Sequence, residues 1–397
     1  MLLKSGKYIT RRYLGEPLVI RIFVKSRLKP GSPGGIGKLL NNLINSSNHN
    51  YDIHFLIIKS EYSTSNAVNI YLLRMIFNFI NDLATSSKMA CEAHTDAIMY
   101  VGSIPHLSII AAKLCSKPVI LYVNGYVHHE LINRVRTSSK LYISLKEILR
   151  FIWAETLFGI GNLFVDVYVF PCYGTYENSK IPRNKNYKII PLWFSEQEID
   201  RIISKQNLLG GEKENNKMYG ENKKIIITYT SNVYSPKILS SQHLIKLGQL
   251  IKSRSKQEFD FLIIDPKSKP QQVSNYIKVM SRLSREEYFK LLAKSFLYID
   301  SVIDDELRYS TLEAMLLGVP VAKITHPRYW DKLDFKYELF STSVREFIER
   351  VAWYIDHAEE LYPMYSSKVR EYVLSKRRWN NVRNYFLEIF ELIGGKH

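Results

Sequence analysis

The sequence predicts an α/β protein with two domains, each built around a parallel sheet. Short apolar runs alternate with longer segments of helical periodicity, which is the pattern of βαβ units. The alternation stops at a polar stretch over residues 195–223 and then starts again. A chain of 397 residues is also too long for one ordinary hydrophobic core. We therefore expect domains at 1–194 and 224–375, joined by a partly flexible linker at 195–223.

The first domain is expected to contain six strands, each a short run rich in β-branched and aromatic residues. Helices with apolar residues at helical spacing are expected between them. The expected strands cover residues 18–24, 51–58, 97–101, 118–123, 166–170 and 188–192, and the helices cover 39–44, 69–83 and 103–114.

A glycine-rich loop at residues 30–38 follows the first expected strand and leads into a helix. Gly34 and Gly35 allow a backbone to approach a ligand closely, and a helix start favours anions. The loop lacks the Gly-Lys-Ser/Thr ending of a phosphate-binding P-loop, so a plain tight turn is the alternative interpretation. Ligands of parallel sheets bind beyond the carboxyl ends of the strands, where Asn124 also falls, after the fourth strand.

The segment 126–158 combines basic side chains with an apolar, aromatic helical pattern. Such a segment is typical of contact with an anionic membrane surface. An ordinary helix with its apolar face in the core and a solvated basic face has the same pattern. The neighbouring His128 and His129 do not predict a metal site, because adjacent side chains diverge and no third ligand is evident.

The second domain repeats the alternation of strands and helices. Its expected strands cover residues 224–229, 260–264, 296–299 and a short part of 273–280, and its helices cover 243–252, 285–293, 344–356 and 381–393.

The acidic segment 304–321 carries the strongest chemical signal in the second domain. Ser310 precedes Glu313 by three residues, which predicts a capping box at the start of a helix, and Gly318 and Pro320 end that helix. A helix start suits a phosphate, and the carboxylates of Asp305 and Glu313 suit sugar hydroxyls, which donate hydrogen bonds. These features predict a site for a sugar nucleotide, although loop carboxylates are also often simply solvated.

Composition adds two constraints. A net charge of +17 predicts an anionic partner, such as a phosphorylated substrate, an anionic membrane or nucleic acid, unless surplus lysine is merely spread over the surface. The three cysteines, Cys91, Cys115 and Cys172, are odd in number and far apart, which argues against a disulfide framework or a zinc site. We therefore expect a reducing, cytoplasmic setting, with no secretory signal and no membrane-spanning segment.

The segment from Asp305 to Val321 resembles the E-x7-E motif of retaining GT-B glycosyltransferases, above all those of glycosyltransferase family four. That family's motif reads Glu-Gly-Phe-Gly-x4-Glu-Ala-Met-x-x-Gly-x-Pro-Val, and Asp305 and Glu313 stand at its two acidic positions. The glycines at 34–37, Lys237 and Trp379 are similar to further segments of the family, so the resemblance extends over nearly the whole chain.

This resemblance implies two Rossmann-like domains facing each other across a cleft, the GT-B arrangement, with a helix at 376–397 returning toward the first domain. The first domain would bind the acceptor and the second the nucleotide-sugar donor. Glu313 would accept the ribose hydroxyls, Asp305 would contact the donor sugar, and Lys237 would neutralise the departing diphosphate. No metal and no other cofactor is implied. The further positions implied to bind the diphosphate are Ser310, Thr311, Gly34 and Gly35.

Within the motif, the sequence departs from the family at two places. The first acid is Asp305 instead of glutamate, and the adjacent Glu306 is the alternative candidate. Leu307 and Arg308 replace the usual Phe-Gly, and the Arg308 side chain is a candidate for phosphate contact.

Two departures lie outside the motif. The arginine that usually precedes the lysine falls on Asn232. The histidine usually found after the fourth strand of the first domain falls on Asn124, and His128 is a nearby candidate to replace it. These changes concern catalytic detail more than fold.

The resemblance thus implies a retaining, metal-independent glycosyltransferase of the hexosyltransferase type, acting on a nucleotide-sugar donor and a glycan or lipid-linked acceptor. The acceptor hydroxyl would attack from the face that the diphosphate leaves, so no pair of carboxylates at glycosidase spacing is expected. The expected location is cytoplasmic and peripheral at the inner face of a membrane. The alternatives are a non-catalytic GT-B-like binding protein, suggested by the altered motifs, and a nucleic-acid-binding protein, suggested by charge but without a recognisable motif.

Overall fold

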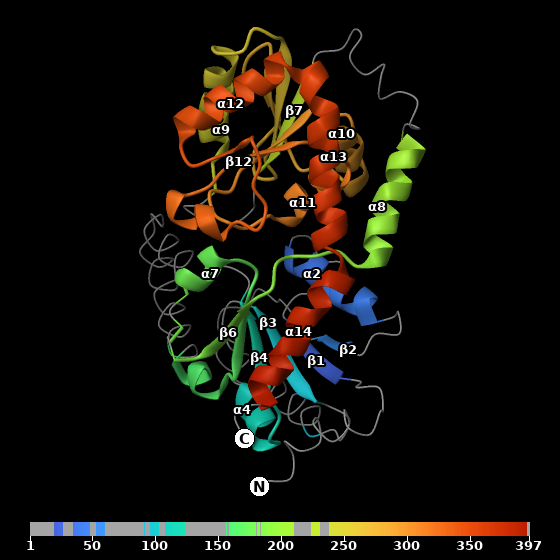
Figure 1. The fold of residues 1–397 in the computed structure, drawn as a ribbon, viewed down its shortest axis with the longest axis vertical. Coiled ribbons are helices and arrows are strands. Elements are labelled where there is room, and N and C mark those ends of the chain that lie inside the picture. The colour runs from blue at the N-terminus through green and yellow to red at the C-terminus, as the bar shows by residue number, and fades with distance from the viewer. Residues whose placement is uncertain are drawn as a thin grey trace, which may run out of the picture. The chain divides into compact units, whose positions relative to one another are not determined.

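The computed structural model describes residues 20–26, 35–47, 53–59, 91, 96–102, 108–123, 156, 159–179, 181–182, 184–209, 224–230 and 238–394. The chain divides into two compact units, the first comprising Met1–Pro191 with Val382–His397 and the second Leu192–Asn381. Each unit is an α/β domain around a mainly parallel sheet (Figure 1), which confirms the predicted fold class.

The first unit contains a sheet of six described strands in the order β2-β1-β3-β4-β5-β6, with every neighbouring pair parallel. Strands β3, β4 and β5 consist almost entirely of buried residues, as expected for parallel strands covered on both faces. The strands are β1 Ile20–Ser26, β2 Ile53–Lys59, β3 Ala97–Gly102, β4 Val119–Val123, β5 Val167–Phe170 and β6 Asn186–Ile189.

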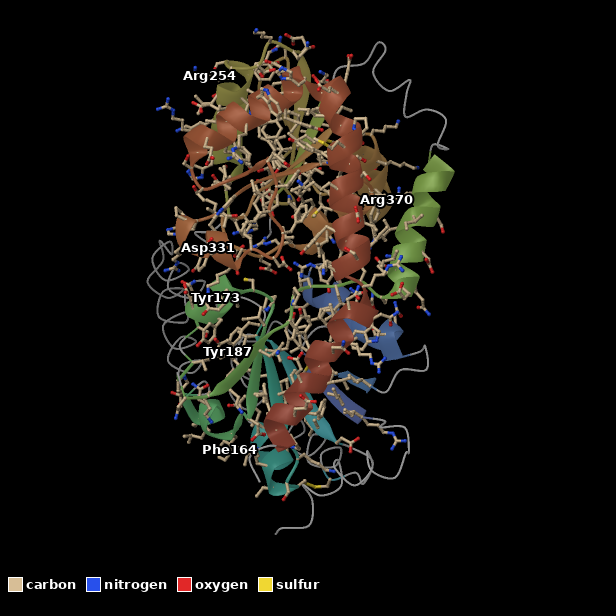
Figure 2. The ribbon with its side chains drawn as sticks, viewed as in Figure 1. Phe164, Tyr173, Tyr187, Arg254, Asp331 and Arg370 are labelled. Carbon is tan, nitrogen blue, oxygen red and sulfur yellow. A yellow bond between two sulfur atoms is a disulfide. The ribbon has the colours of Figure 1, made fainter. Side chains whose placement is uncertain are left out.

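Three helices described in this unit are α2 Gly35–Ser47, α4 Ser108–Leu114 and α7 Tyr173–Glu177. Aromatic side chains join α7 to the edge strand β6, where Figure 2 labels Tyr173 and Tyr187. Tyr176 of α7 stacks on Tyr187 at 3.8 Å between ring centroids and meets Tyr173 edge-on. The final helix, α14 Trp379–Gly394, belongs to this unit from Val382 onward, where its Glu388 forms an ion pair with Lys188 of β6.

The second unit contains a seven-stranded sheet in the order β13-β12-β11-β7-β8-β10-β9. Among the described strands of this sheet, only the edge pair β9 and β10 is antiparallel. The strands are β7 Lys224–Tyr229, β8 Phe259–Ile264, β9 Gln271–Gln272, β10 Ile277–Met280, β11 Leu297–Asp300, β12 Val321–Ile324 and β13 Phe340–Ser341. The chain adds β8, β10 and β9 on one side of β7, and then returns to add β11, β12 and β13 on the other side. The carboxyl ends of β7 and β11 therefore form a topological switch point, which is where open α/β sheets bind ligands.

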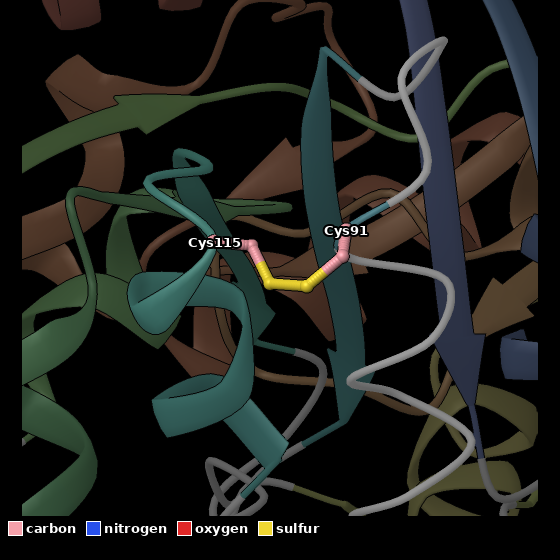
Figure 3. The surroundings of a disulfide bond; sticks show 2 residues. All are labelled: Cys91 and Cys115. Atoms are coloured by element: carbon pink, nitrogen blue, oxygen red, sulfur yellow. A yellow bond between two sulfur atoms is a disulfide. The ribbon is translucent and has the colours of Figure 1, made fainter.

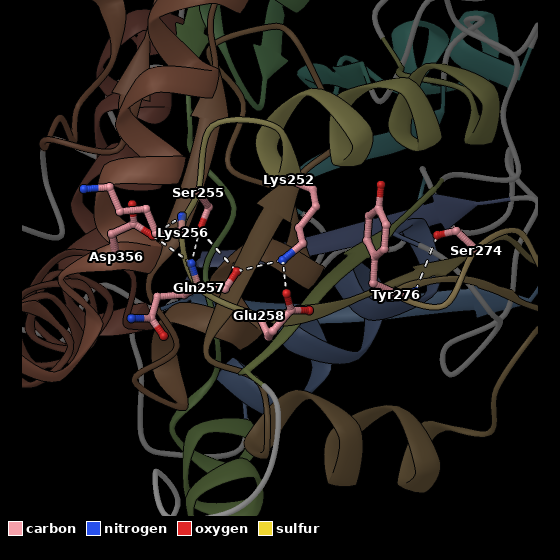
Figure 4. Close-up of polar contacts among 8 residues, drawn as sticks. All are labelled: Lys252, Ser255, Lys256, Gln257, Glu258, Ser274, Tyr276 and Asp356. Carbon is pink, nitrogen blue, oxygen red and sulfur yellow. Dashed lines mark hydrogen bonds and ion pairs between the residues drawn. The ribbon is translucent and has the colours of Figure 1, made fainter.

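Helices cover both faces of this sheet (Figure 1). The packed pair α9 Ser241–Lys252 and α12 Val344–Asp356 is held partly by Asp356, whose Oδ1 accepts from Ser255 Oγ and from the backbone N–H groups of Lys256 and Gln257 (Figure 4). The remaining elements are α8 Glu196–Leu209, α10 Arg285–Ala293, α11 Tyr309–Leu316, the 3-10 helix η2 Pro327–Lys332 and α13 Ala358–Lys376.

Residues 195–223, predicted as a partly flexible linker, include a helix in the structure. Residues 196–209 form α8, which packs against α10 and α11 of the second unit, and the rest of the stretch, 210–223, lies outside the described residues. Its polar composition suggested a linker, but an amphipathic surface helix also needs only a narrow apolar stripe, and Ile199 and Ile202 supply it.

The cysteines also differ from expectation. Cys91 and Cys115 form a disulfide with a Cα–Cα distance of 5.2 Å (Figure 3). Cys172 is a buried thiol that takes no part in a disulfide. The expectation of no disulfide was wrong because the fold brings together two cysteines 24 residues apart in sequence, a proximity that spacing alone does not show.

Among the residues that the structure describes, no helix combines the length and the apolar character needed to span a bilayer.

Candidate functional site

The site predicted in the second half of the chain lies at the switch point of the second unit's sheet. The loop after β11 begins with Ser301, whose hydroxyl donates to the carbonyl of Tyr229, the last residue of β7 (2.8 Å). The backbone N–H of Leu239 donates in turn to the Ser301 carbonyl (2.8 Å), and Ile238 forms a bridge with Val302. The loops that leave β7 and β11 are thus fastened to each other where a ligand is expected.

The loop after β7 contains Asn232 and Lys237, which lie outside the described residues. Both ends of this loop are fixed by Asp265, which follows β8: its carboxylate accepts hydrogen bonds from Ser241 at the start of α9 and from Thr230 at the end of β7. Burial alone would raise the pKa of Asp265, but these bonds, with those from Ser268 and Lys267, outweigh it and hold the pKa below its ordinary value.

A buried ion pair lies beneath the acidic loop. Lys323 of β12 donates from Nζ to Asp300 Oδ2 (3.1 Å) and to the carbonyl of Val302 (2.8 Å). The other Asp300 oxygen accepts from the backbone N–H of Val302 (3.1 Å), so the first residues of the loop are held from the sheet side. Lys323 was not identified from the sequence, because a single lysine in an apolar strand does not show that it has a buried acidic partner.

The acidic loop itself places three carboxylates in a row. Asp304 and Asp305 are buried, and Asp304 Oδ1 accepts from the backbone N–H of Glu306 (3.1 Å). Burial, with the negative charge of Asp304, raises the pKa of Glu306 from its ordinary 4.5 to about 7. At neutral pH the Glu306 carboxyl is therefore partly protonated, and it can donate as well as accept a hydrogen bond.

The helix that follows, α11, starts two residues earlier than the predicted capping box indicates. Arg308 is its N-cap, with extended backbone (φ −70°, ψ 164°) and no side-chain cap bond, and the first helical residue is Tyr309. The predicted capping box of Ser310 and Glu313 is therefore wrong, because a capping residue lies before the helix and Ser310 lies inside it. Ser310 instead hydrogen bonds to the hydroxyl of the buried Tyr298.

Thr311 and Glu313 point into protein from α11. The Thr311 side chain is fully buried, and its hydroxyl has no hydrogen-bond partner among the described residues. Glu313 is 1% exposed, and its Oε1 lies 3.3 Å from Nη2 of Arg285, the first residue of α10. Burial of a carboxylate with an arginine partner marks Glu313 as more than a solvated surface acid.

Arg285 and its second partner, Glu198 of α8, were not identified from the sequence. A signal for Arg285 was present: Ser284 and Glu287 form the capping box of α10, with both reciprocal hydrogen bonds in place. A capping box after β10 places the next residue, Arg285, near the carboxyl edge of a parallel sheet.

The candidate residues of the first unit are mostly outside the described part of the chain. Gly34, Asn124 and His128 are not described, and of the basic aromatic segment 126–158 only Thr156 is. Gly35 is the first residue of α2, so the helix after β1 begins four residues before the expected residue 39, and residues 35–38 are helical instead of part of the loop.

No family model matches the sequence, and no curated protein matches it. Solved structures do match. Sucrose-phosphate synthase from Thermosynechococcus elongatus aligns with a TM-score of 0.59 and 9% identity over 95% of this chain and all of its own.

Two further structures align over similar lengths. HepE from Anabaena, in complex with UDP, has a TM-score of 0.56 and 12% identity over 94% of this chain and 100% of that chain. The N-terminal domain of trehalose-6-phosphate phosphatase from Candida albicans has a TM-score of 0.56 and 10% identity, with 96% and 98% covered. These likenesses show that the chain has the GT-B fold, with two Rossmann-like domains.

Proposed function

We propose that this protein is a glycosyltransferase that moves a sugar from a nucleotide-sugar donor to a glycan or lipid-linked acceptor, with retention of configuration and without a metal ion. The observation that carries the proposal is the buried carboxylate of Glu313. It lies on α11, the helix that starts at the switch point of the second unit's sheet, and is paired with Arg285 of α10. The fold supports it, since HepE was solved with UDP and with UDP-glucose.

The second unit supplies the groups for a donor. The first backbone N–H groups of α11, at Ser310 and Thr311, suit the diphosphate, and Arg308 beside them adds a positive charge. Glu313 would accept the ribose hydroxyls, because an ionised carboxylate only accepts hydrogen bonds. The sugar would then lie against the acidic loop, where Asp305 and Glu306 are the candidates for its hydroxyls.

Other groups enter the proposal through the family resemblance. Lys237 would stabilise the charge that develops on the departing diphosphate, with Asn232 beside it. In the first unit, Gly34 and Gly35 would approach the diphosphate, and Asn124 or His128 would contact the sugar. The acceptor hydroxyl would attack from the side on which the diphosphate leaves, so the enzyme mainly positions the reactants and stabilises the leaving group.

Donor binding tests the proposal directly. We expect a thermal-shift and calorimetric screen of UDP-, GDP- and ADP-sugars to identify at least one that binds, and Glu313→Gln to weaken its binding about tenfold or more, because a hydrogen bond to a charged group contributes about 1.5–3 kcal/mol. Glu349→Gln, in an exposed pair with Arg345, is the matched control and should bind normally. Failure of every nucleotide sugar to bind would exclude the proposed function.

Turnover tests the chemistry separately from binding. The protein should hydrolyse its donor slowly in the absence of acceptor, and excess EDTA should leave this rate unchanged if no metal takes part. Proton NMR of the first product should show the anomeric configuration of the donor. Donor binding without any turnover would favour the non-catalytic binding protein, which the substitutions at Asp305, Asn232 and Asn124 make a specific alternative.

The proposal includes peripheral attachment to an anionic membrane face, motivated by the net charge of +17 and the segment 126–158. The Cys91–Cys115 disulfide removes the ground on which a reducing, cytoplasmic setting was expected, so the proposal names no compartment. Co-sedimentation with vesicles that contain anionic lipid, at low and high salt, tests it. Binding at low salt that weakens as salt screens the charges would support attachment, and no binding at low salt would reject it.

A further inference from the structure

A chain of alternating charges runs across three helices of the second unit and ends at Glu313. Nη2 of Arg285, in α10, contacts Oε1 of both Glu198 and Glu313, from α8 and α11 respectively. The Glu198 oxygen also accepts from Nη2 of Arg201, one turn along α8 (2.6 Å). Arg285 thus bridges the two glutamates.

The members of this chain differ in exposure. Glu313 is 1% exposed and Glu198 13%, whereas Arg285 is 36% and Arg201 48% exposed. A buried carboxylate needs a positive partner, while a pair at the surface contributes little. The contacts of Arg285 are therefore expected to stabilise the buried carboxylate more than the contact of Arg201 does, although both arginines contact the same Glu198 oxygen.

The backbone fixes both ends of the bridge. The capping box of Ser284 and Glu287 sets the first residue of α10, and the Arg285 guanidinium lies 5.2 Å above the ring centroid of the buried Phe289. Ser195 accepts the backbone N–H of Glu198, which holds that residue in the first turn of α8. Arg285 is therefore held on three sides and presents a fixed nitrogen to Glu313.

We propose that Arg285 is a positioning residue for recognition of the nucleotide's ribose, and that Glu198 positions Arg285. By binding Oε1, Arg285 sets the orientation in which the Glu313 carboxylate meets the ribose hydroxyls. This inference rests on the proposed function, because it requires that Glu313 accept those hydroxyls. It adds two residues to the donor site and links the first turn of α8 to donor recognition.

The readout is the preference for ribose over deoxyribose. UDP, GDP and ADP are titrated into the intact protein, and the diphosphate that binds is compared with its 2′-deoxy counterpart. The wild-type protein should bind the ribonucleotide about tenfold more tightly, since the deoxy compound lacks one hydroxyl for Glu313. Arg285→Met should weaken ribonucleotide binding about tenfold and deoxyribonucleotide binding little. The ratio of the two affinities should therefore fall toward one.

Further variants separate positioning from folding. Arg285→Lys keeps a cation and should recover part of the preference, even if Arg285→Met folds poorly. Glu198→Gln keeps an acceptor for Arg285 and should lose less of the preference than Glu198→Ala. Arg201→Ala is the matched control and should retain the full preference and affinity.

The possible results distinguish the inference from the proposed function. Equal weakening of both nucleotides by Arg285→Met, or a full ribose preference in Arg285→Met or in Glu198→Ala, would overturn the inference while donor binding by the wild-type protein still supports the function. If the wild-type protein binds no nucleotide, the function fails and the inference fails with it. A ribose preference that is lost in Arg285→Met and Glu313→Gln but kept in Arg201→Ala supports both.

Discussion

Lys323 and Asp300 pair across adjacent parallel strands where both side chains are excluded from solvent, with exposures of 0% and 2%. Asp300 is the last residue of β11, so the pair lies directly before the acidic loop of the candidate donor site. Removing two charges from water costs free energy. Here that desolvation cost is offset by the ion pair itself and by two further hydrogen bonds, to the backbone N–H and C=O of Val302. The geometry indicates that the pair fixes where the loop begins.

Removing one partner should therefore be more damaging than removing both. We expect Lys323→Met to destabilise the second unit by about 3–5 kcal/mol, because it leaves the Asp300 carboxylate buried and unpaired. The double variant with Asp300→Leu should recover much of this loss. Denaturant unfolding measures both effects, and Lys336→Met, which removes an exposed pair with Asp331, should change stability by less than about 0.5 kcal/mol. Equal losses in the single and double variants would contradict this account.

Gly318 ends α11 with φ +75°, a conformation that side-chain-bearing residues adopt at a cost. A Cβ at this position would also lie 2.6 Å from Oγ of Ser366 in α13. We expect Gly318→Ala to lower the free energy of unfolding by about 1–2 kcal/mol, mainly through backbone strain, because the serine hydroxyl can rotate away. Denaturant unfolding should then show little recovery when Ser366→Ala is added.

The control for this prediction is Gly102 at the end of β3, where a Cβ would meet no atom within 4 Å. Gly102→Ala should not reduce stability. If adding Ser366→Ala restored the full stability lost in Gly318→Ala, the close contact with Ser366, and not the backbone conformation, would be the reason that glycine is required.

Most strands of the two sheets could be predicted from sequence because buried parallel strands are short apolar runs. The short strands β9, β12 and β13 were not among the expected strands. Helix α10 was predicted with its observed bounds, and the structure adds a capping box of Ser284 and Glu287 at its start. Helix α13 was not predicted: Pro363 lies inside it, and its apolar residues are sparse. The capping box predicted at Ser310 was wrong because the spacing of Ser310 and Glu313 does not show which residue has the extended backbone of an N-cap.

For the candidate site, sequence located the loop and helix but not the contacts that organise them. Asp305, Glu306 and Glu313 were identified from one contiguous motif. Arg285, Glu198 and Lys323 lie far from that motif in sequence and reach it only through helix and strand packing. Spacing along a chain cannot show such contacts, because they depend on which elements become neighbours in the fold.

The disulfide between Cys91 and Cys115 predicts a simple thiol count. Of three cysteines, only Cys172 should react with Ellman's reagent when the protein is unfolded without reductant, and all three should react after reduction. Reduction should also destabilise the first unit by about 2–4 kcal/mol, because an open chain has more conformational freedom when unfolded. A Cys172→Ser variant is the control, with no reactive thiol before reduction. Three reactive thiols without reductant would show that the pair is not formed.

The raised pKa of Glu306 predicts a specific dependence of stability on pH. Its pKa is about 7 in the folded protein and near 4.5 in an unfolded chain, so between these values the folded state binds more protons. Stability should therefore fall as pH rises from about 4.5 to 7, by on the order of 3 kcal/mol from this group, and level off above that. Denaturant unfolding across this range should show that Glu306→Gln lacks this contribution and gains stability relative to wild type as pH rises. Glu258→Gln, in an exposed pair with Lys252, should follow the wild-type slope, whereas parallel curves for Glu306→Gln and wild type would mean that Glu306 ionises as freely in the folded loop as in water.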